Sequence, residues 1–130
     1  SSLNQKILNM KKILCLPAII NNENILNFFE HKIGDVLVSG KYGILEPKKK
    51  NKLLPKVIII PCLAFDLYGY RLGYGGGYYD KTIQHYKKIR HSFISVGFAY
   101  EDQKIEKVLQ NDFDQRLDYI LTEKQLYKAK

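Results

Sequence analysis

The chain has 130 residues, of which 45% are apolar and 26% are charged. This length predicts a single domain, residues 1–130, and the composition excludes an intrinsically disordered chain. The longest apolar stretch, Val57 to Phe65, contains Pro61 and is far shorter than the roughly 20 residues of a membrane helix, so we expect no membrane span.

The charge balance predicts an anionic partner. There are 21 Lys and Arg residues against 13 acidic residues, which gives a net charge of +8. Nucleic acid, a membrane surface and a phosphorylated small molecule would all be attracted. Only Arg71, Arg90 and Arg116 are arginines, whereas specific nucleic-acid readers rely on Arg. We therefore interpret most of the Lys excess as a solvated surface and expect no nucleic-acid partner.

The cysteines and histidines do not form a recognisable site. Cys15 and Cys62 each lie in an apolar run, outside any Cys-x-x-Cys pattern, which predicts buried thiols in a reducing compartment. His31, His85 and His91 lie in unrelated contexts and are expected to fill surface or core positions. Because residues 1–12 also lack the hydrophobic region of a signal peptide, we expect a cytoplasmic protein.

The first half of the chain predicts one helix followed by short strands. Leu3, Ile7, Leu8 and Met10 have helical spacing and precede a β-rich run that ends at Pro17. A Lys-rich segment with Pro47 and Pro55 around it, residues 48–52, is typical of an exposed loop. The predicted strands are Ile13 to Leu16, Ile25 to Phe29 and Val36 to Val38.

The second half predicts an α/β arrangement. Val57 to Ile60 has no polar interruption, which favours a strand in the middle of a sheet, covered on both faces. A helix is expected over Tyr78 to Lys88, with Tyr79, Ile83 and Tyr86 on one face, and a strand near Phe93 to Phe98. This order implies a right-handed parallel crossover. The expected C-terminal elements are a helix marked by Ile105, Val108 and Leu109, a strand over Tyr119 to Thr122 and a short helix from Glu123.

Glycine and tyrosine concentrate between Asp66 and Asp80. Five of the 9 glycines lie between Gly69 and Gly77. Since ordering glycine is costly, such a cluster in a folded domain indicates positive φ angles or a close approach of another group to the backbone. Backbone N–H groups from Gly73 to Tyr79, ahead of a helix, could bind phosphate oxygens, and Arg71 could add a charged donor. The alternative is a structural turn packed under tyrosines.

Two carboxylates could complete such a site. Asp80 lies in the first turn of the predicted helix, where it either stabilises the helix dipole or helps to hold the Mg²⁺ that accompanies a nucleotide. Asp114 precedes the predicted strand over Tyr119 to Thr122 and could supply a second ligand. Asp112 and Asp118 are rivals that spacing does not eliminate. Neither a complete dinucleotide fingerprint nor a P-loop is present.

These segments together resemble the 5-formyltetrahydrofolate cyclo-ligase family. Ile60 to Asp80 is similar to that family's signature almost throughout. Lys41 to Pro47, Val96 to Tyr100 and Phe113 to Glu123 resemble three further segments of the family. The resemblance implies a mainly parallel, three-layer α/β fold of the NagB-like type, with helices on both faces of the sheet.

The resemblance also implies an activity. Family members use ATP and Mg²⁺ to convert 5-formyltetrahydrofolate to 5,10-methenyltetrahydrofolate, with release of ADP and phosphate. It implies catalytic roles for Arg71 and Tyr78, and magnesium ligation by Asp80 and Asp114. The ATP residues carried over are Arg71, Leu72, Gly73, Tyr74, Gly75, Gly76, Gly77, Tyr78 and Tyr79, and those carried over for the folate are Tyr74, Gly75, Gly76, Gly77 and Tyr78.

The chain departs from the family pattern mainly at its N-terminus. The family's first basic helix, which contributes Lys and Arg to the nucleotide, and its first strand are not found, so we expect an N-terminally short member. Its exposed sheet edge predicts a homodimer or an N-terminal partner chain. The alternatives to an enzyme are a non-catalytic ATP- or folate-binding remnant, an assembly partner of the same fold and, less favoured, a basic RNA-binding module.

Overall fold

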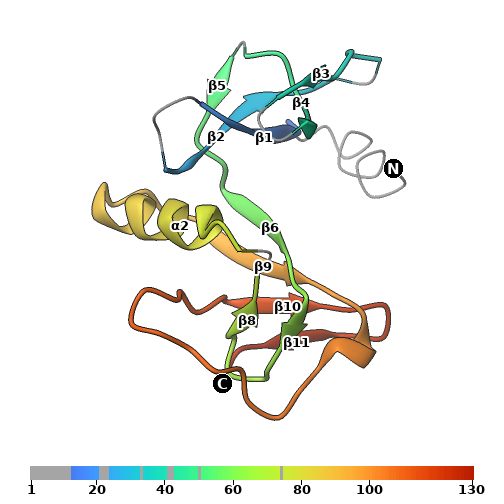
Figure 1. Cartoon of the computed structure of the whole chain (residues 1–130), viewed down its shortest axis with the longest axis vertical. Helices are drawn as coiled ribbons and strands as arrows, with labels where there is room; N and C mark the ends of the chain where they lie inside the picture. The colour runs from blue at the N-terminus through green and yellow to red at the C-terminus, as the bar shows by residue number, and fades with distance from the viewer. Residues whose placement is uncertain (1–12, 21–23, 33, 41–42, 50, 74) are drawn as a thin grey trace. The chain divides into compact units, whose positions relative to one another are not determined.

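The computed structural model describes residues 13–20, 24–32, 34–40, 43–49, 51–73 and 75–130. The helix predicted from Leu3, Ile7, Leu8 and Met10 lies outside the described residues. The chain divides into two compact units, Ser1–Pro55 and Lys56–Lys130, and each is described by itself (Figure 1). The single domain expected from the length stays a prediction.

The first unit contains two antiparallel sheets. One has the order β1-β2-β5, with β1 at Cys15–Ile19, β2 at Leu26–Glu30 and β5 at Lys52–Leu53. The other pairs β3 at Val38–Ser39 with β4 at Leu45–Glu46. The predicted strands Ile13 to Leu16 and Ile25 to Phe29 are confirmed with shifted ends, whereas the third, Val36 to Val38, shares only Val38 with β3. The buried apolar residues are Leu14, Ala18, Leu26, Phe28 and Phe29.

Pro17 does not end the first strand, as the sequence predicted. It lies within β1 and pairs with Phe28 of β2. β1 is the outer strand of the sheet order. Proline has no N–H group to donate. An edge strand tolerates it, because half of the backbone N–H groups of such a strand have no neighbouring strand to bind.

Glu46 is a buried carboxylate that the sequence analysis did not single out. Its side chain is among the buried polar groups of the first unit. Oε2 accepts a hydrogen bond from the backbone N–H of Ile19 at 2.8 Å, which ties β4 to the end of β1. A Cβ atom at Gly40 would lie 2.1 Å from the Glu46 carboxyl carbon, so the chain needs glycine there to admit this side chain.

The second unit is built on a mixed four-stranded sheet with the order β11-β10-β9-β6. The strands are β6 at Val57–Pro61, β9 at Ile94–Phe98, β10 at Tyr119–Leu121 and β11 at Leu126–Lys128. The pairs β6–β9 and β9–β10 are parallel, whereas β10–β11 is antiparallel. The expected α/β class and parallel crossover pair are thus confirmed, but the sheet is mixed and the described residues contain one α-helix.

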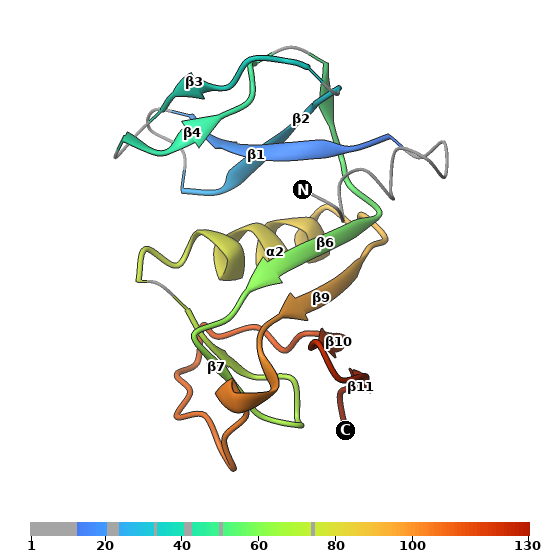
Figure 2. The same cartoon turned by 90° about the vertical axis from the view of Figure 1, so that its right-hand side faces the viewer.

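That helix, α2 at Tyr78–Lys88, has the predicted bounds. Figures 1 and 2 both show it beside β6 and β9. Thr82, Ile83 and Tyr86 are buried, while Tyr79 is half-buried. These four residues repeat with the 3.6-residue period of a helix, so they form one face, and this face of α2 is the one that is buried. No helix in the described part of the chain is long and apolar enough to span a membrane.

The expected central position of β6 is wrong. Among the strands of the described residues, β6 is the outer one of the four-stranded sheet and pairs with β9 alone. Ile58 and Ile60 are buried, but Val57 and Ile59 are 53% and 38% exposed. An uninterrupted apolar run predicted burial on both faces, and the structure shows burial on one face only.

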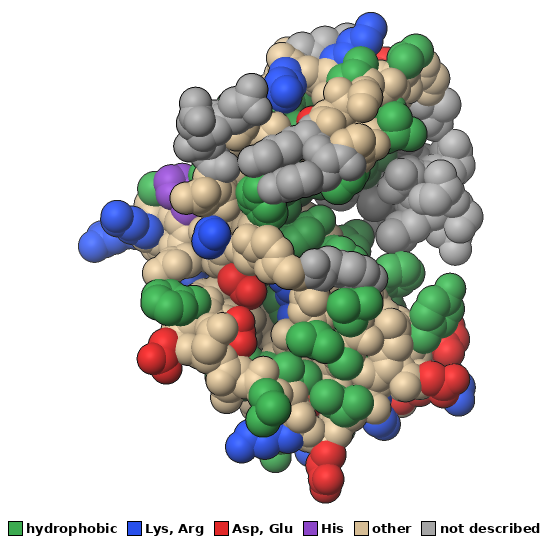
Figure 3. Space-filling view, viewed as in Figure 1, with side chains coloured by type: hydrophobic (Ala, Val, Ile, Leu, Met, Phe, Trp, Pro, Cys, Tyr) green, Lys and Arg blue, Asp and Glu red, His purple; other side chains and the backbone are tan. Residues whose placement is uncertain are grey.

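The segment between β9 and β10 contains no α-helix, contrary to prediction. A short 3₁₀ turn, η2 at Glu101–Gln103, is its only helical element among the described residues. The Ile105 N–H donates to the Phe65 carbonyl at 2.8 Å, which fixes this segment by a contact distant in sequence. Figure 3 shows exposed hydrophobic side chains on the visible face of this unit. Leu109 is 92% exposed and Phe113 is 72% exposed.

The helix expected from Glu123 onward is also wrong. Leu126–Lys128 is strand β11, which pairs with β10. Thr122 Oγ1 accepts hydrogen bonds from the N–H groups of Lys124 at 3.1 Å and Gln125 at 3.2 Å. These bonds form a tight turn, which directs the chain back along β10.

Candidate functional site

A glycine turn, residues 73–77, connects a small hairpin to α2. The hairpin pairs β7 at Ala64–Phe65 with β8 at Arg71–Leu72. Gly75 has φ +116° and Gly77, the N-cap of α2, has φ +71°. L-residues rarely adopt these angles, so glycine is required at both positions. The predicted positive φ angles are confirmed.

The backbone of the glycine turn is open at its centre. A Cβ atom at Gly75 would meet no heavy atom of the described residues within 4 Å. Gly77 provides no side-chain cap for the first N–H groups of α2. A helix start has unpaired N–H donors and a partial positive charge, both of which favour an anion. Leu72 is 52% exposed beside this turn, and Tyr74 lies outside the described residues.

Arg71 is buried behind the turn. Its side chain is 5% exposed, and Nη1 donates a hydrogen bond to the Pro61 carbonyl at 3.2 Å. Nε is buried and has no hydrogen-bond partner among the residues that the structure describes. Since a buried unpaired donor is costly, this N–H is suited to an acceptor from outside the chain. A Cβ atom at Gly73 would lie 2.6 Å from Nη1, so Gly73 leaves the space that the guanidinium occupies.

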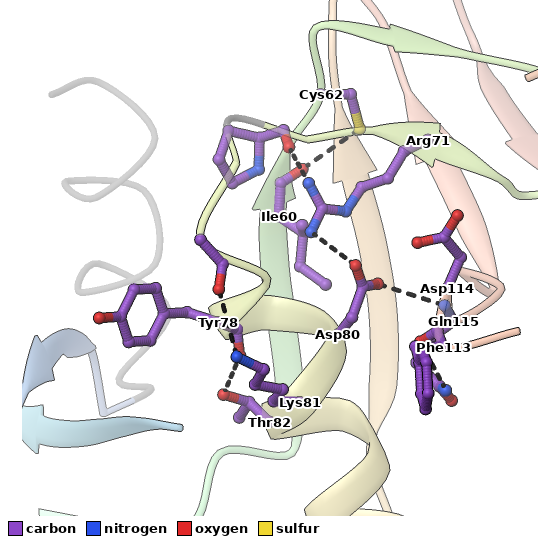
Figure 4. Close-up of polar contacts among 12 residues, drawn as sticks. Ile60, Cys62, Arg71, Tyr78, Asp80, Lys81, Thr82, Phe113, Asp114 and Gln115 are labelled. Atoms are coloured by element: carbon purple, nitrogen blue, oxygen red, sulfur yellow. Dashed lines mark hydrogen bonds and ion pairs between the residues drawn. The ribbon is translucent and has the colours of Figure 1, made fainter. Parts of the chain in front are cut away.

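Asp80 lies between Arg71 and the loop that precedes β10 (Figure 4). Its Oδ2 is 4.0 Å from Arg71 Nη2, and its Oδ1 accepts the backbone N–H of Gln115 at 3.2 Å. The Asp80 side chain is 21% exposed. The carboxylate thus balances the guanidinium while it keeps access to solvent.

Asp114 is brought to the same place by that loop. It directly precedes Gln115, whose N–H is bound by Asp80. Its own Oδ2 accepts the Asn111 N–H at 2.9 Å, which closes a tight turn. The structure therefore places the two predicted magnesium carboxylates on neighbouring segments.

The two rival carboxylates lie elsewhere in the loop. Asp118 Oδ2 accepts hydrogen bonds from the Ser95 N–H at 2.8 Å and the Ser95 hydroxyl at 3.1 Å, so this carboxylate fixes the start of β9. Asp112 is exposed. The described residues contain no group of three or more metal-ligating side chains. A cation here would need oxygens from its own ligand, which is how Mg²⁺ usually binds with phosphates.

Two tyrosines flank the turn. The ring of Tyr78 lies 2.8 Å from the position of a Cβ atom on Gly76, so it packs against the bare backbone. The ring of Tyr79 lies under the Arg71 guanidinium, at 5.5 Å from the ring centroid. Burial raises the pKa of the Tyr79 phenol, and the positive charge of Arg71 partly opposes this rise. Tyr79 therefore presents a neutral ring to the guanidinium at neutral pH.

Lys81 is a residue of the site that the sequence analysis missed. Its Nζ donates a hydrogen bond to the Gly76 carbonyl at 3.5 Å, so the side chain folds back toward the glycine turn. Lys81 is exposed, so its ammonium adds a positive charge beside the glycine turn. The sequence could have indicated this contact, because a helical side chain points toward the N-terminus of its helix. A residue four positions after the N-cap can therefore reach the turn before the helix.

Neither cysteine has the environment of a reactive thiol. Cys62 is 2% exposed, and its thiol donates to the Ile60 carbonyl at 3.5 Å. Burial raises the pKa of Cys62 to about 11, despite the opposing charge of Arg71. Burial also raises the pKa of Cys15, and both thiols are free. The prediction that these residues pack as small apolar groups is confirmed for Cys62 and stays open for half-buried Cys15.

Comparison with known proteins gives consistent matches. A family model described as the 5-formyltetrahydrofolate cyclo-ligase family matches residues 1–123. The 5-formyltetrahydrofolate cyclo-ligase of Haemophilus influenzae is 33% identical over 123 residues, which cover 90% of this chain and 65% of that protein. The enzyme of that name from Escherichia coli strain K12 is 34% identical over 108 residues, which cover 79% of this chain and 58% of its own length.

A solved structure agrees with these matches. The NMR structure of Aquifex aeolicus 5,10-methenyltetrahydrofolate synthetase superposes with a TM-score of 0.77 at 32% identity. The match covers 99% of this chain and 64% of that chain. This chain therefore spans about three fifths to two thirds of the length of these relatives.

Proposed function

Because the chain belongs to the 5-formyltetrahydrofolate cyclo-ligase family, we propose that it binds Mg-ATP at the glycine turn and converts 5-formyltetrahydrofolate to 5,10-methenyltetrahydrofolate. The observation that carries this proposal is the buried Nε of Arg71, which has no hydrogen-bond partner in the described part of the chain and lies close in sequence to the glycine turn. An anionic oxygen would satisfy this donor. The matched relatives carry the same activity in their names.

The residues of the site suit a phosphate chain and a magnesium ion. The N–H groups at the start of α2 and Arg71 would bind phosphate oxygens, while Asp80 and Asp114 would hold the ion together with them. Bound Mg-ATP supplies the phosphoryl group that activates the poorly reactive formyl oxygen. Arg71 would neutralise negative charge during the transfer, which is its proposed catalytic role.

Tyrosines would hold the folate. The Tyr78 ring lies against Gly76 and is half-buried, so it offers an aromatic face next to the phosphate site. We assign to Tyr78, and to the backbone of Gly75 to Gly77, the positioning of the folate ring system against the phosphoryl group. Positioning of the two reactants is the main contribution that a protein makes to such a reaction. We assign the reaction to the cytoplasm, which the two free thiols support.

The direct test is to incubate the chain with 5-formyltetrahydrofolate and Mg-ATP. We expect the methenyl chromophore to form only when all components are present. ATP-dependent thermal stabilisation without product would instead identify a nucleotide-binding protein that lacks the ligase activity. Failure of both measurements would contradict the proposal.

Lys81 should strengthen nucleotide binding without taking part in the chemistry. In Lys81→Met we expect the KM for Mg-ATP to rise about fivefold while kcat stays near its original value, because an exposed cation attracts the phosphates in the ground state and the transition state alike. The rise should shrink at high salt, since salt screens exposed charges. Steady-state kinetics at two salt concentrations measures this. Lys88→Met, an exposed position at the other end of α2, is the matched control.

We further propose that a second copy of the chain covers the edge strand β6. Its exposed apolar residues Val57 and Ile59 support this, since natural proteins rarely leave such an edge uncovered. Light scattering should give a dimer mass, and Ile59→Lys should give a monomer. A monomer for the unchanged chain at micromolar concentration would contradict the dimer and would favour a separate partner chain.

A further inference from the structure

A cavity of about 410 Å³ in the second unit has a lining rich in hydrogen-bond donors. It lies between the β7–β8 hairpin turn, the segment after η2 and the chain before β10. None of its residues belongs to the glycine turn. The lining residues other than Asp66 are Tyr68, Tyr70, Lys107, Gln110, Arg116 and Lys130.

The single side-chain carboxylate of the lining, that of Asp66, already accepts hydrogen bonds from the backbone. Asp66 is 1% exposed, and its Oδ1 accepts the N–H groups of Tyr68 at 3.0 Å and Tyr70 at 3.1 Å. Its Oδ2 accepts the Val108 N–H at 3.0 Å. Three backbone donors stabilise the negative charge of Asp66. Lys107, Arg116 and Lys130 therefore dominate the charge that the cavity presents to a ligand.

Arg116 is held in position on the cavity wall. Its Nε donates to the Tyr68 carbonyl at 2.8 Å, and its Nη2 donates to a main-chain oxygen of Lys130, which in this 130-residue chain is part of the terminal carboxylate. Within the described residues its third nitrogen, Nη1, makes no hydrogen bond, and neither Arg116 nor Lys107 forms an ion pair with an Asp or Glu side chain. A guanidinium fixed by two bonds loses little freedom when it binds an anion, so its free donors are pre-organised.

We propose that this cavity is a second anion site, which binds a small oxyanion with several negative charges on phosphate or carboxylate groups. Arg116 and Lys107 supply the charged donors, and the hydroxyl groups of Tyr68 and Tyr70 supply neutral donors. Charge-assisted hydrogen bonds from a fixed Arg and an adjacent Lys are the usual means of binding such groups. The proposal rests on the cavity alone and does not require the ligase activity.

The test is an NMR titration of the ¹⁵N-labelled chain with sodium pyrophosphate, and separately with citrate, at constant ionic strength. We expect saturable shifts of the amide signals of Tyr68, Tyr70, Val108 and Arg116. The Lys107 side chain makes no hydrogen bond to the described residues, so Lys107→Gln should leave the fold unchanged. We expect this variant to bind the anion about tenfold more weakly. Arg116→Gln should weaken binding further, and Lys88→Gln, with the same change in charge outside the cavity, should bind normally.

Comparison of pyrophosphate with citrate shows whether the site prefers phosphate or carboxylate groups. Tighter binding of pyrophosphate supports a phosphate ligand, and tighter binding of citrate supports a carboxylate ligand. Shifts that do not saturate, shifts confined to Gly75 to Asp80, or equal affinity of Lys107→Gln and Lys88→Gln would each overturn the proposal. Because the readout is binding at these amides, failure here leaves the ligase proposal untouched, and an inactive chain leaves the second site untouched.

Discussion

Gly75→Val should abolish formation of the methenyl product, with a loss of about 100-fold or more, while the chain stays folded. Gly75 has φ +116°, which a β-branched residue adopts only with strain. The turn would move to relieve that strain, and displacement of a positioning group by about 1 Å is enough for a loss of this size. The valine side chain would also occupy the open space over the backbone, where we propose that phosphate binds. Turnover and ATP-induced thermal stabilisation measure both effects.

The chain offers a matched control for this substitution. Gly34 also has a positive φ, +89°, and a Cβ atom there would likewise meet no heavy atom within 4 Å in the described part of the chain. Gly34→Val should therefore cost a similar amount of stability, about 1–3 kcal/mol, and leave turnover within about twofold of the original. Equal loss of turnover in both variants would show that the effect of Gly75→Val is general destabilisation.

The sequence predicted the structure best where the prediction depended on the spacing of residues close together in the chain. The helix α2 was predicted with its observed bounds, because Ile83 and Tyr86 repeat at helical spacing after a run of glycines that cannot continue a helix. The positive φ angles of the glycine turn were predicted for an equally local reason. Both depend on residues that are neighbours in the chain, and in these two segments the tertiary contacts agree with the local pattern.

The errors fall where distant residues decide the structure. Ile105, Val108 and Leu109 have helical spacing, but the N–H groups of Ile105 and Val108 donate to Phe65 and Asp66 instead of to the preceding turn of a helix. No local pattern reports such partners. The edge position of β6 is a second case, since a short apolar run does not reveal how many neighbours its strand has.

The contacts between the candidate site residues could not be predicted from the sequence. Spacing named Asp114 as the second carboxylate but did not eliminate Asp112 and Asp118. The structure separates them, because Asp118 binds Ser95 of β9 and Asp114 precedes the residue whose N–H binds Asp80. The burial of Arg71, and the unpaired donor that follows from it, could not be read from the sequence, since both depend on Pro61 and Asp80.

Asp80→Asn should reduce turnover about 100-fold and should raise the magnesium concentration needed for half-maximal rate. The amide keeps an oxygen that can accept the Gln115 N–H, so the loop that carries Asp114 should stay in place. What the variant removes is the negative charge, which we propose holds the ion and which balances Arg71 at 4.0 Å. A circular dichroism melt checks the fold, and a magnesium titration of the rate measures the loss.

Asp112→Asn is the control for that experiment. It removes one negative charge from the same loop, at an exposed position close in sequence to Asp114. Since it lies outside the contacts that join Asp80, Gln115 and Arg71, we expect its magnesium dependence to match that of the unchanged chain. If Asp80→Asn kept full turnover with an unchanged magnesium requirement, the carboxylate would serve only to balance the buried guanidinium, and the assignment of the metal to Asp80 would be wrong.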